Sequence, residues 1–366
     1  MRHASAVAAV FAFTSILSYA QNVKVTALGA RTGEFCSPDR AILFEDPTGV
    51  RILYDPATTI AGGGDTRLGA VHAVLVSHGH GDHIGNAQLN QDPNSSSAMC
   101  ASGVPVTATP NSNAAGIAAA KNSAVIVAPE LAAFMMRKLQ NVMGSAPAGC
   151  PAAGVNNEMI VPATQSCVGT LGYGAKRTLR VMSAQSGVQI AVIPASHGNG
   201  VPADEISEPL RTQLATDNLS FPPGVASSYI IKFTNGMTAF LSGDTGLTAE
   251  MSTIVRDYYG ANFAVFNIGD IFTTGPEEAA FAINRLIRPA SVIPSHANEQ
   301  ATQGGTVMSG TKTARFMSLV RGAEVVPPLS GTVMEFNSRG RCVAGCPAGQ
   351  RGNRAIEDDS ERPAAP

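Results

Sequence analysis

The stretch VLVSHGHGDHIGN, residues 74–86, places three histidines and one aspartate within six residues. The whole chain of 366 residues holds only seven histidines, so nearly half of them lie in this segment. His78 and His80 project to the same side of an extended segment, whereas Asp82 and His83 fall at the start of the next element. Imidazole and carboxylate side chains at this spacing favour a metal site over a polar strand end with scattered histidines.

Two further histidines and one aspartate stand at the ends of other apolar runs. His197 closes AVIPASH, His296 closes SVIPSH, and Asp244 follows FLSG in the same way. Four strands thus present seven ligand-type side chains at their C-terminal ends. That number suits two metal ions that share one bridging carboxylate, each with an open position for water. Two histidines are left outside the site: His3 in the N-terminal leader and His72 within a strand.

Short apolar runs predict two strand-rich halves, each accompanied by helices. In the first half we expect strands at residues 23–28, 41–46, 50–55, 71–77 and 124–128 and a helix at 129–140. In the second half we expect strands at 187–195, 227–233, 237–243, 263–269, 291–296 and 331–336 and helices at 247–258, 276–287 and 312–322. This pattern predicts two sheets packed together with helices outside.

Composition separates three further segments from this pattern. Residues 88–120 are rich in Asn, Ser, Ala, Gly and Pro and are predicted as an insertion or long loop within a single domain, residues 21–338. Residues 339–366 are polar and rich in Gly and Pro, and we expect a flexible C-terminal tail. Because the net charge is −2 and no basic block is present, nucleic acid is not an expected partner.

The N-terminus has the pattern of an export signal. A basic start precedes an apolar stretch, Ala6–Leu17, and small residues at Ser18 and Ala20 favour cleavage before Gln21. The apolar stretch is shorter than the roughly 20 residues of a membrane-spanning helix. We therefore predict a signal peptide over residues 1–20 and a periplasmic or secreted protein with no stable membrane association after cleavage.

Six cysteines in an exported chain predict structural disulfide bonds. None of them lies inside the histidine motifs, and sequence cannot choose among the possible pairings. Cys100 and Cys150 flank one region, and a bond between them would staple it. The six are Cys36, Cys100, Cys150, Cys167, Cys342 and Cys346.

From Val23 to about Phe336, the chain resembles the metallo-β-lactamase superfamily, whose signature HxHxDH is followed by a distant His, Asp and His. The segments SHGHGDHIGN, LSGDTGL, GDIFTTGPEEAAFAI and VIPSH are similar to those of a narrower group, the ascorbate-6-phosphate lactonase-like metal-dependent hydrolases. The resemblance implies an α/β fold, the four-layer αββα sandwich, in which two mixed β-sheets pack face to face with helices outside.

The resemblance also implies a role for each ligand. Asp244 would bridge two metals, and the other ligands divide into a first set, His78, His80 and His197, and a second set, Asp82, His83 and His296. Asp55 in YDP matches an early motif acid of the family, which supports the metal site from behind. A simple turn aspartate before Pro56 is the equal alternative.

The implied function is a hydrolase with two divalent metal ions, zinc in the first place and manganese or iron as alternatives. A metal-activated hydroxide would cleave a small-molecule ester, lactone, amide or phosphodiester. Asp244 and Asp82 are the candidate catalytic acids, with Asp82 as a proton carrier to the leaving group. An iron-dependent oxidoreductase on the same fold and a β-lactam hydrolase are the alternatives, although a bridging Asp in GDTG argues against the latter.

Three residues depart from the pattern of the narrower group. Asp270 stands where that group has glycine, and Asn298 and Glu299 follow the last histidine in place of tyrosine. They are either groups of the substrate pocket or solvated loop and helix-capping residues. An acidic rim would disfavour a phosphorylated substrate.

Overall fold

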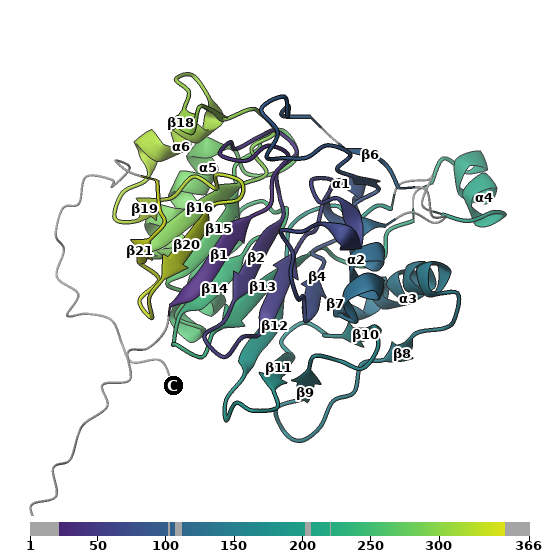
Figure 1. Cartoon of the computed structure of the whole chain (residues 1–366). Coiled ribbons are helices and arrows are strands. Elements are labelled where there is room, and N and C mark those ends of the chain that lie inside the picture. The colour runs from purple at the N-terminus through teal and green to yellow at the C-terminus, as the bar shows by residue number, and fades with distance from the viewer. Residues whose placement is uncertain (1–21, 102, 107–111, 202–205, 220, 348–366) are drawn as a thin grey trace, which may run out of the picture.

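The computed structural model describes residues 22–101, 103–106, 112–201, 206–219 and 221–347. Within these ranges, two large β-sheets pack face to face (Figure 1). The predicted signal peptide, residues 1–20, lies outside the described residues, as does the end of the predicted tail beyond residue 347.

The first sheet has nine strands and is mixed. In spatial order they are β21 (Cys342–Ala344), β20 (Val333–Phe336), β1 (Val23–Ala27), β2 (Ile42–Glu45), β3 (Arg51–Tyr54), β4 (Ala73–Leu75), β7 (Ala124–Val127), β10 (Cys167–Thr170) and β8 (Ala148–Gly149). Strands β3, β4, β7 and β10 run parallel, so their C-terminal ends meet at one edge of the sheet.

The second sheet has eight strands and is also mixed. In spatial order they are β19 (Glu324–Val325), β16 (Ser291–Ser295), β15 (Phe263–Asn267), β14 (Thr238–Leu241), β13 (Ser227–Lys232), β12 (Val188–Pro194), β11 (Lys176–Val181) and β9 (Glu158–Val161). Strand β13 is antiparallel to both β12 and β14, and β14, β15 and β16 are parallel. Strands β12, β14 and β16 therefore end on the same side.

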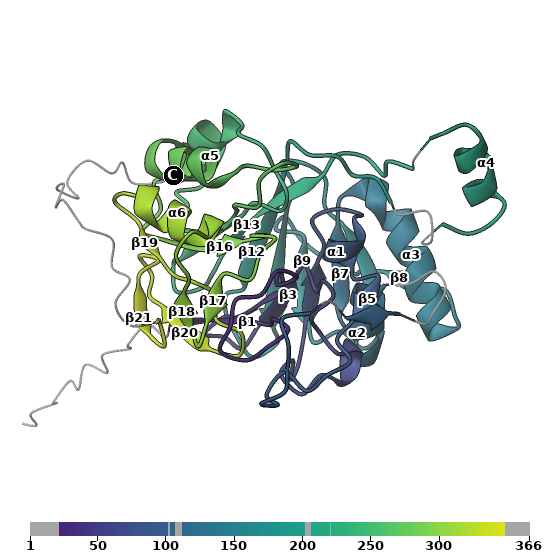
Figure 2. The ribbon, with the colours of Figure 1, turned by 90° about the horizontal axis from the view of Figure 1, so that it is seen from above.

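Helices cover the outer faces of both sheets (Figure 2). On the first sheet these are α2 (Asn113–Lys121) and α3 (Pro129–Met143), and on the second they are η3 (Met251–Tyr258), α5 (Pro276–Phe281), η4 (Ala282–Ile287) and α6 (Lys312–Leu319). The short elements are η1 (Gly62–Gly64), α1 (Gly81–Ile84) and the strand pairs β5 (Ala87–Gln88) with β6 (Val104–Pro105) and β17 (Thr302–Gln303) with β18 (Thr306–Val307). Helix α4 (Leu210–Thr216) projects from the body without a buried residue. None of the helices in the described ranges is long and apolar enough to span a bilayer.

Alternation along the strands explains why their sequences are apolar almost throughout. In β2, Ile42 and Phe44 point into the core between the sheets, whereas Leu43 points into the core beneath α2 and α3. In β15, Val265 lies between the sheets and Phe266 lies under the helices of the second sheet. Both faces of each sheet are thus covered. The predicted four-layer αββα sandwich is confirmed.

Two sequence-based expectations are corrected by the structure. Helix α2 occupies the end of the predicted loop 88–120, because Ser112 caps it by accepting a hydrogen bond from the Ala115 amide and the alanines that follow favour helix. Strand β21 falls within the predicted tail 339–366 and pairs with β20, so the first sheet extends to Ala344. Strands β9, β10 and β11, between residues 158 and 181, were not predicted at all.

The six cysteines form three disulfide bonds: Cys36–Cys100, Cys150–Cys167 and Cys342–Cys346. The hypothesis of a bond between Cys100 and Cys150 is therefore wrong. Cys167 lies in β10, which pairs with β8 directly before Cys150, so strand pairing brings these two cysteines together.

One buried tyrosine joins the two sheets next to the strand ends. Tyr229, in β13 of the second sheet, is fully buried, and its hydroxyl lies 2.7 Å from the carbonyl oxygen of Val76 and 3.1 Å from that of Ile126. Both carbonyls belong to the first sheet or its loops. The hydroxyl therefore fixes the distance between the two sheets at Val76, directly before Ser77 and His78.

We predict that Tyr229→Phe lowers the free energy of unfolding by about 1–2 kcal/mol, because two buried carbonyls lose their shared donor. Tyr173→Phe is the control, since the Tyr173 hydroxyl bonds the Val225 carbonyl in an exposed position. Urea unfolding of both variants, after metal has been stripped, measures the difference. Equal stability of the two variants would contradict this role for Tyr229.

Candidate metal centre

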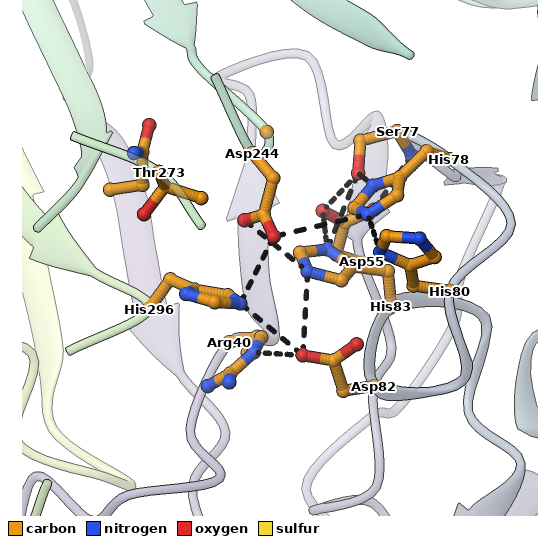
Figure 3. Close-up of polar contacts among 12 residues, drawn as sticks. Arg40, Asp55, Ser77, His78, His80, Asp82, His83, Asp244, Thr273 and His296 are labelled. Atoms are coloured by element: carbon orange, nitrogen blue, oxygen red, sulfur yellow. Dashed lines mark hydrogen bonds and ion pairs between the residues drawn. The ribbon is translucent and has the colours of Figure 1, made fainter. Parts of the chain in front are cut away.

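The predicted ligands lie together at one end of the sandwich, where strands of both sheets end (Figure 3). His78 follows β4 of the first sheet. His197, Asp244 and His296 follow β12, β14 and β16 of the second sheet. Because these strands end on the same side, loops that are far apart in sequence deliver their polar side chains to one place.

Helix α1 and its N-cap residue supply the remaining three ligands. His80 is its N-cap residue, with extended backbone, and the helix begins at Gly81. Asp82 and His83 therefore lie within α1, close to His78 in the loop that follows β4.

Four of the seven side chains form one group: His78, His80, His197 and Asp244. His78 Nε2 lies 2.9 Å from His80 Nδ1, and His197 Nε2 lies 3.4 Å from the same nitrogen. His197 Nε2 is also 3.6 Å from Asp244 Oδ2. The ring nitrogens of three imidazoles thus face one another and a carboxylate oxygen.

The other three side chains form a second group: Asp82, His83 and His296. His296 Nε2 lies 3.3 Å from Asp82 Oδ2, and His83 Nε2 lies 3.7 Å from the same oxygen. Asp244 reaches this group as well, since its Oδ2 is 3.1 Å from His296 Nε2 and its Oδ1 is 3.4 Å from His83 Nε2. Asp244 therefore lies between the two groups.

Asp55, at the end of β3, supports both groups from behind. Its Oδ2 lies 2.8 Å from His83 Nδ1 and accepts a hydrogen bond from Ser77 Oγ, also at 2.8 Å. Ser77 Oγ in turn lies 2.9 Å from His78 Nδ1. Asp55 is buried and adopts a positive φ of 39°. Its carboxylate is the direct partner of His83 and, through Ser77, the indirect partner of His78.

Further contacts orient the ligands from the second sheet. The Phe272 carbonyl lies 3.1 Å from His197 Nδ1, which leaves Nε2 facing Asp244. Asn298 Nδ2 lies 3.3 Å from His296 Nδ1. Asn298, one of the three residues that depart from the pattern of the narrower hydrolase group, therefore belongs to the site.

The other two departures lie outside the ligand groups. Glu299 caps helix α6, since its carboxylate accepts hydrogen bonds from the Lys312 and Thr313 amides at 3.0 Å each. Asp270 is exposed, and its carboxylate accepts a hydrogen bond from the amide of Ile271. The helix-capping alternative is confirmed for Glu299, whereas the exposed position of Asp270 fits both a solvated loop and the rim of a pocket.

Arg40 is a residue of the site that the sequence did not indicate. It lies in the loop before β2, and its Nε donates to Asp82 Oδ2 at 3.0 Å. Its Nη2 donates to Asn298 Oδ1 at 2.6 Å. Arg40 is a single arginine before a strand, and it forms no recognisable sequence pattern with the histidine motif. The sequence alone therefore does not indicate this contact.

Burial keeps the first group of histidines neutral. It lowers the pKa of His78 well below its usual value, and the neighbouring His83 adds to this effect. Burial also lowers the pKa values of His80 and His197. Neutral imidazoles have free lone pairs, which is the state required of a metal ligand.

The centre of the site is dominated by carboxylates. Burial alone would lower the pKa of His83, but Asp244, Asp82 and Asp55 outweigh it and raise that pKa well above its usual value. Burial alone would raise the pKa values of Asp244 and Asp82, yet His83 and His296 hold both well below the usual range. Both carboxylates are therefore anionic and draw positive charge into the site.

Two buried atoms at the centre lack a hydrogen-bond partner. These are His83 Nε2 and Asp244 Oδ1, which face each other at 3.4 Å. A buried polar atom without a partner is costly. A cation between them would satisfy both the imidazole lone pair and the carboxylate oxygen, so the donor set fits a divalent transition metal.

The chain is similar to several proteins named UPF0173 metal-dependent hydrolase. The protein from Polynucleobacter asymbioticus is 26% identical over 304 residues, which cover 79% of this chain and 81% of that protein. The protein from Pelotomaculum thermopropionicum is 30% identical over 225 residues, which cover 62% of this chain and 66% of that protein. No family model matches the chain.

Among solved structures, Igni18, a metallo hydrolase from Ignicoccus hospitalis, superposes with a TM-score of 0.49 and 20% sequence identity. The superposition covers 86% of this chain and 99% of that chain.

The similarity to metal-dependent hydrolases confirms the predicted enzyme class, a metal-dependent hydrolase, on the αββα sandwich described above. It also supports the resemblance to the metallo-β-lactamase superfamily. The narrower likeness to the ascorbate-6-phosphate lactonase-like group stays a prediction.

We predict that Gly243→Ala destabilises the protein by about 2 kcal/mol or more, because Gly243 combines a left-handed backbone with close packing. Its φ is +58°, and an added Cβ would lie 2.7 Å from the Ser227 carbonyl oxygen and 3.0 Å from Ser77 Cβ. Gly246→Ala is the matched control, since the nearest atom to its added Cβ lies 3.8 Å away. Chemical unfolding of metal-stripped protein tests this, and a Gly243→Ala variant as stable as the control would contradict it.

Proposed function

We propose that the chain is a hydrolase with a binuclear metal site that cleaves a small-molecule ester, lactone, amide or phosphodiester. One observation carries the proposal: Asp244 lies within contact distance of imidazoles from both ligand groups, as a bridging carboxylate requires. The unpartnered atoms of His83 and Asp244 support the same conclusion, because both are satisfied when cations bind.

In this proposal each group of side chains holds one cation. The first group, His78, His80 and His197, holds one, the second group, Asp82, His83 and His296, holds the other, and Asp244 contributes to both. Zinc suits the nitrogen-rich donor set, and manganese or iron remains compatible with it.

Two such cations supply Lewis acidity, which lowers the pKa of water and polarises a carbonyl or phosphoryl oxygen. The protein supplies orientation. Asp55 and Ser77 fix the rings of His83 and His78. The Phe272 carbonyl fixes the ring of His197. These contacts hold each imidazole with one nitrogen toward the centre, so little reorganisation is needed on binding.

Asp82 is a candidate ligand that is open to solvent, since 45% of its side chain is exposed. That exposure suits a residue that contacts substrate and carries a proton between the leaving group and water. The ion pair with Arg40 stabilises the anionic form of Asp82. It therefore keeps Asp82 unprotonated and makes a proton bound there easy to release.

A hydrolysis screen tests the reaction class. The panel contains lactones, aryl esters, β-lactams and phosphodiesters, each assayed with the metal-loaded protein and with metal-stripped protein. We expect turnover of at least one class that disappears on stripping and returns with Zn²⁺ or Mn²⁺. Metal-independent turnover, or none after reloading, would count against the proposal.

We further propose that the protein works outside the cytoplasm. All six cysteines are paired, and disulfide bonds form and persist in oxidising compartments. The predicted signal peptide over residues 1–20 supports the same location. Fractionation of expressing cells should recover a chain that starts at Gln21 from the periplasm or medium, and a cytoplasmic, uncleaved chain would be contrary to this idea.

We predict that Asp244→Ala loses about one of two metal equivalents and most hydrolytic activity, because two cations lose their shared ligand. Elemental analysis of purified protein measures the metal content. Asp257→Ala is the control, since Asp257 is an exposed acid that pairs with Arg256. Unchanged metal content in Asp244→Ala would refute the bridging role.

We predict that Asp55→Asn weakens metal affinity by about 10–100-fold, as is typical when the partner of a ligating histidine is lost. Asp46→Asn is the matched control. Asp46 is also a buried acid that accepts hydrogen bonds, from Thr48 and Thr234, but it follows β2 at the opposite end of the sheet. Competition with a chromophoric chelator measures affinity in both variants. A similar loss in both would mean that the effect is one of general stability.

A further inference from the structure

Arg40 gives the two ligand groups different charge environments. Asp244 faces only histidines, at 3.1–3.9 Å, in the ion pairs that it forms within the described residues. Asp82 faces histidines and also the Arg40 guanidinium. In Figure 3, Arg40 lies beside Asp82 and His296, away from His78 and His80.

The guanidinium holds the same oxygen that faces the histidines. Asp82 Oδ2 accepts from Arg40 Nε at 3.0 Å and also lies 3.3 Å from His296 Nε2. A cation bound by the second group would therefore share this oxygen with a positive charge. Because like charges repel strongly at short range in a partly buried site, the guanidinium opposes that cation.

The surrounding loop fixes the Arg40 side chain. Only 6% of the side chain is exposed, and its Nη1 and Nη2 donate to the Ser37 carbonyl and to Asn298 Oδ1. The loop itself is held by the Cys36–Cys100 disulfide and by the Asp39 carboxylate. Asp39 accepts hydrogen bonds from the amides of Ala30 and Cys36, each at 2.8 Å. The guanidinium cannot move away when a cation arrives without breaking these contacts.

We propose that Arg40 is a positioning residue that makes the two metal positions unequal. It orients Asp82 but weakens divalent-cation binding by the group Asp82, His83 and His296 relative to the group that contains His78. The protein then holds one cation firmly and exchanges the other. This inference rests on the binuclear site proposed above and adds an order of binding to it.

The test is a metal titration of the full-length chain as purified and then stripped with a chelator. Co²⁺ binding is followed by its visible absorption bands, and Zn²⁺ binding by competition with a chromophoric chelator. We expect two steps in the wild type. In Arg40→Gln, which keeps an N–H donor for Asp82 but has no charge, the second step should tighten by about tenfold or more. The first step should not change.

Arg40→Lys is the matched control because it keeps the charge and loses the planar fork. It should retain a weak second step. If Arg40→Gln does not fold, as judged by circular dichroism, Arg40→Met takes its place as the neutral variant with the same expected result.

Several outcomes would overturn the role of Arg40: two equal steps in the wild type, an unchanged or weaker second step in the neutral variant, or equal tightening in Arg40→Lys. A different result would reject the proposed function itself, namely a wild-type chain that takes up no Zn²⁺ or Co²⁺ at all. The two failures are therefore distinguishable.

Discussion

The Asp244 carboxylate is buried at the point where the two ligand groups meet, and it faces imidazoles on both sides. A buried anion is costly unless positive charge or hydrogen bonds compensate for it. Here Oδ1 has no hydrogen-bond donor, and His83 Nε2 opposite to it has no partner either. Without a cation, a proton on His83 is the remaining source of compensation, as the raised pKa of His83 indicates. Metal binding therefore releases protons and becomes weaker as pH falls.

The scaffold satisfies the geometric requirement of this centre by aligning strand ends from two different sheets. The sheets are tied together next to the ligands: the Tyr229 hydroxyl contacts the Val76 carbonyl, the Ser227 amide donates to the Ser77 carbonyl at 2.9 Å, and the Gly243 amide donates to the Tyr54 hydroxyl at 2.8 Å. Each tie is within one residue or two of a candidate ligand or its supporting side chain. The covered outer faces keep the strands rigid, so the ligands lie on a packed core and not on free loops.

Much of this could be predicted from the sequence because its signals are local. Strands such as β4 and β12 are nearly continuous apolar runs, and the candidate ligands follow them directly. The composition of helix α2 does not indicate a helix, because Ala and Gly next to Ser and Asn are typical of loops, although alanine favours helix once Ser112 provides a cap. Strand β11 gives only a weak signal because KRTLRV holds three basic residues and no apolar run, and a basic residue, Arg177, occupies one of its buried positions.

The parts that could not be predicted depend on contacts between distant segments. Arg40 reaches Asp82 across 42 positions and Asn298 across 258 positions. The partner of Cys100 is Cys36, 64 positions away, and not the cysteine that follows it in sequence. The spacing of these residues in the sequence does not indicate that they are in contact. The contacts form because the β1–β2 loop folds against the insertion and against the loop after β16.

The Cys36–Cys100 bond has a consequence for maturation. It anchors the loop four residues before Arg40 to a segment that otherwise has little regular structure. A chain folded in a reducing environment would still contain every candidate ligand, yet the loop that presents the guanidinium would lack its covalent anchor. The oxidation state of Cys36 and Cys100 therefore affects how firmly the Arg40 guanidinium, and with it a positive charge, is held next to Asp82.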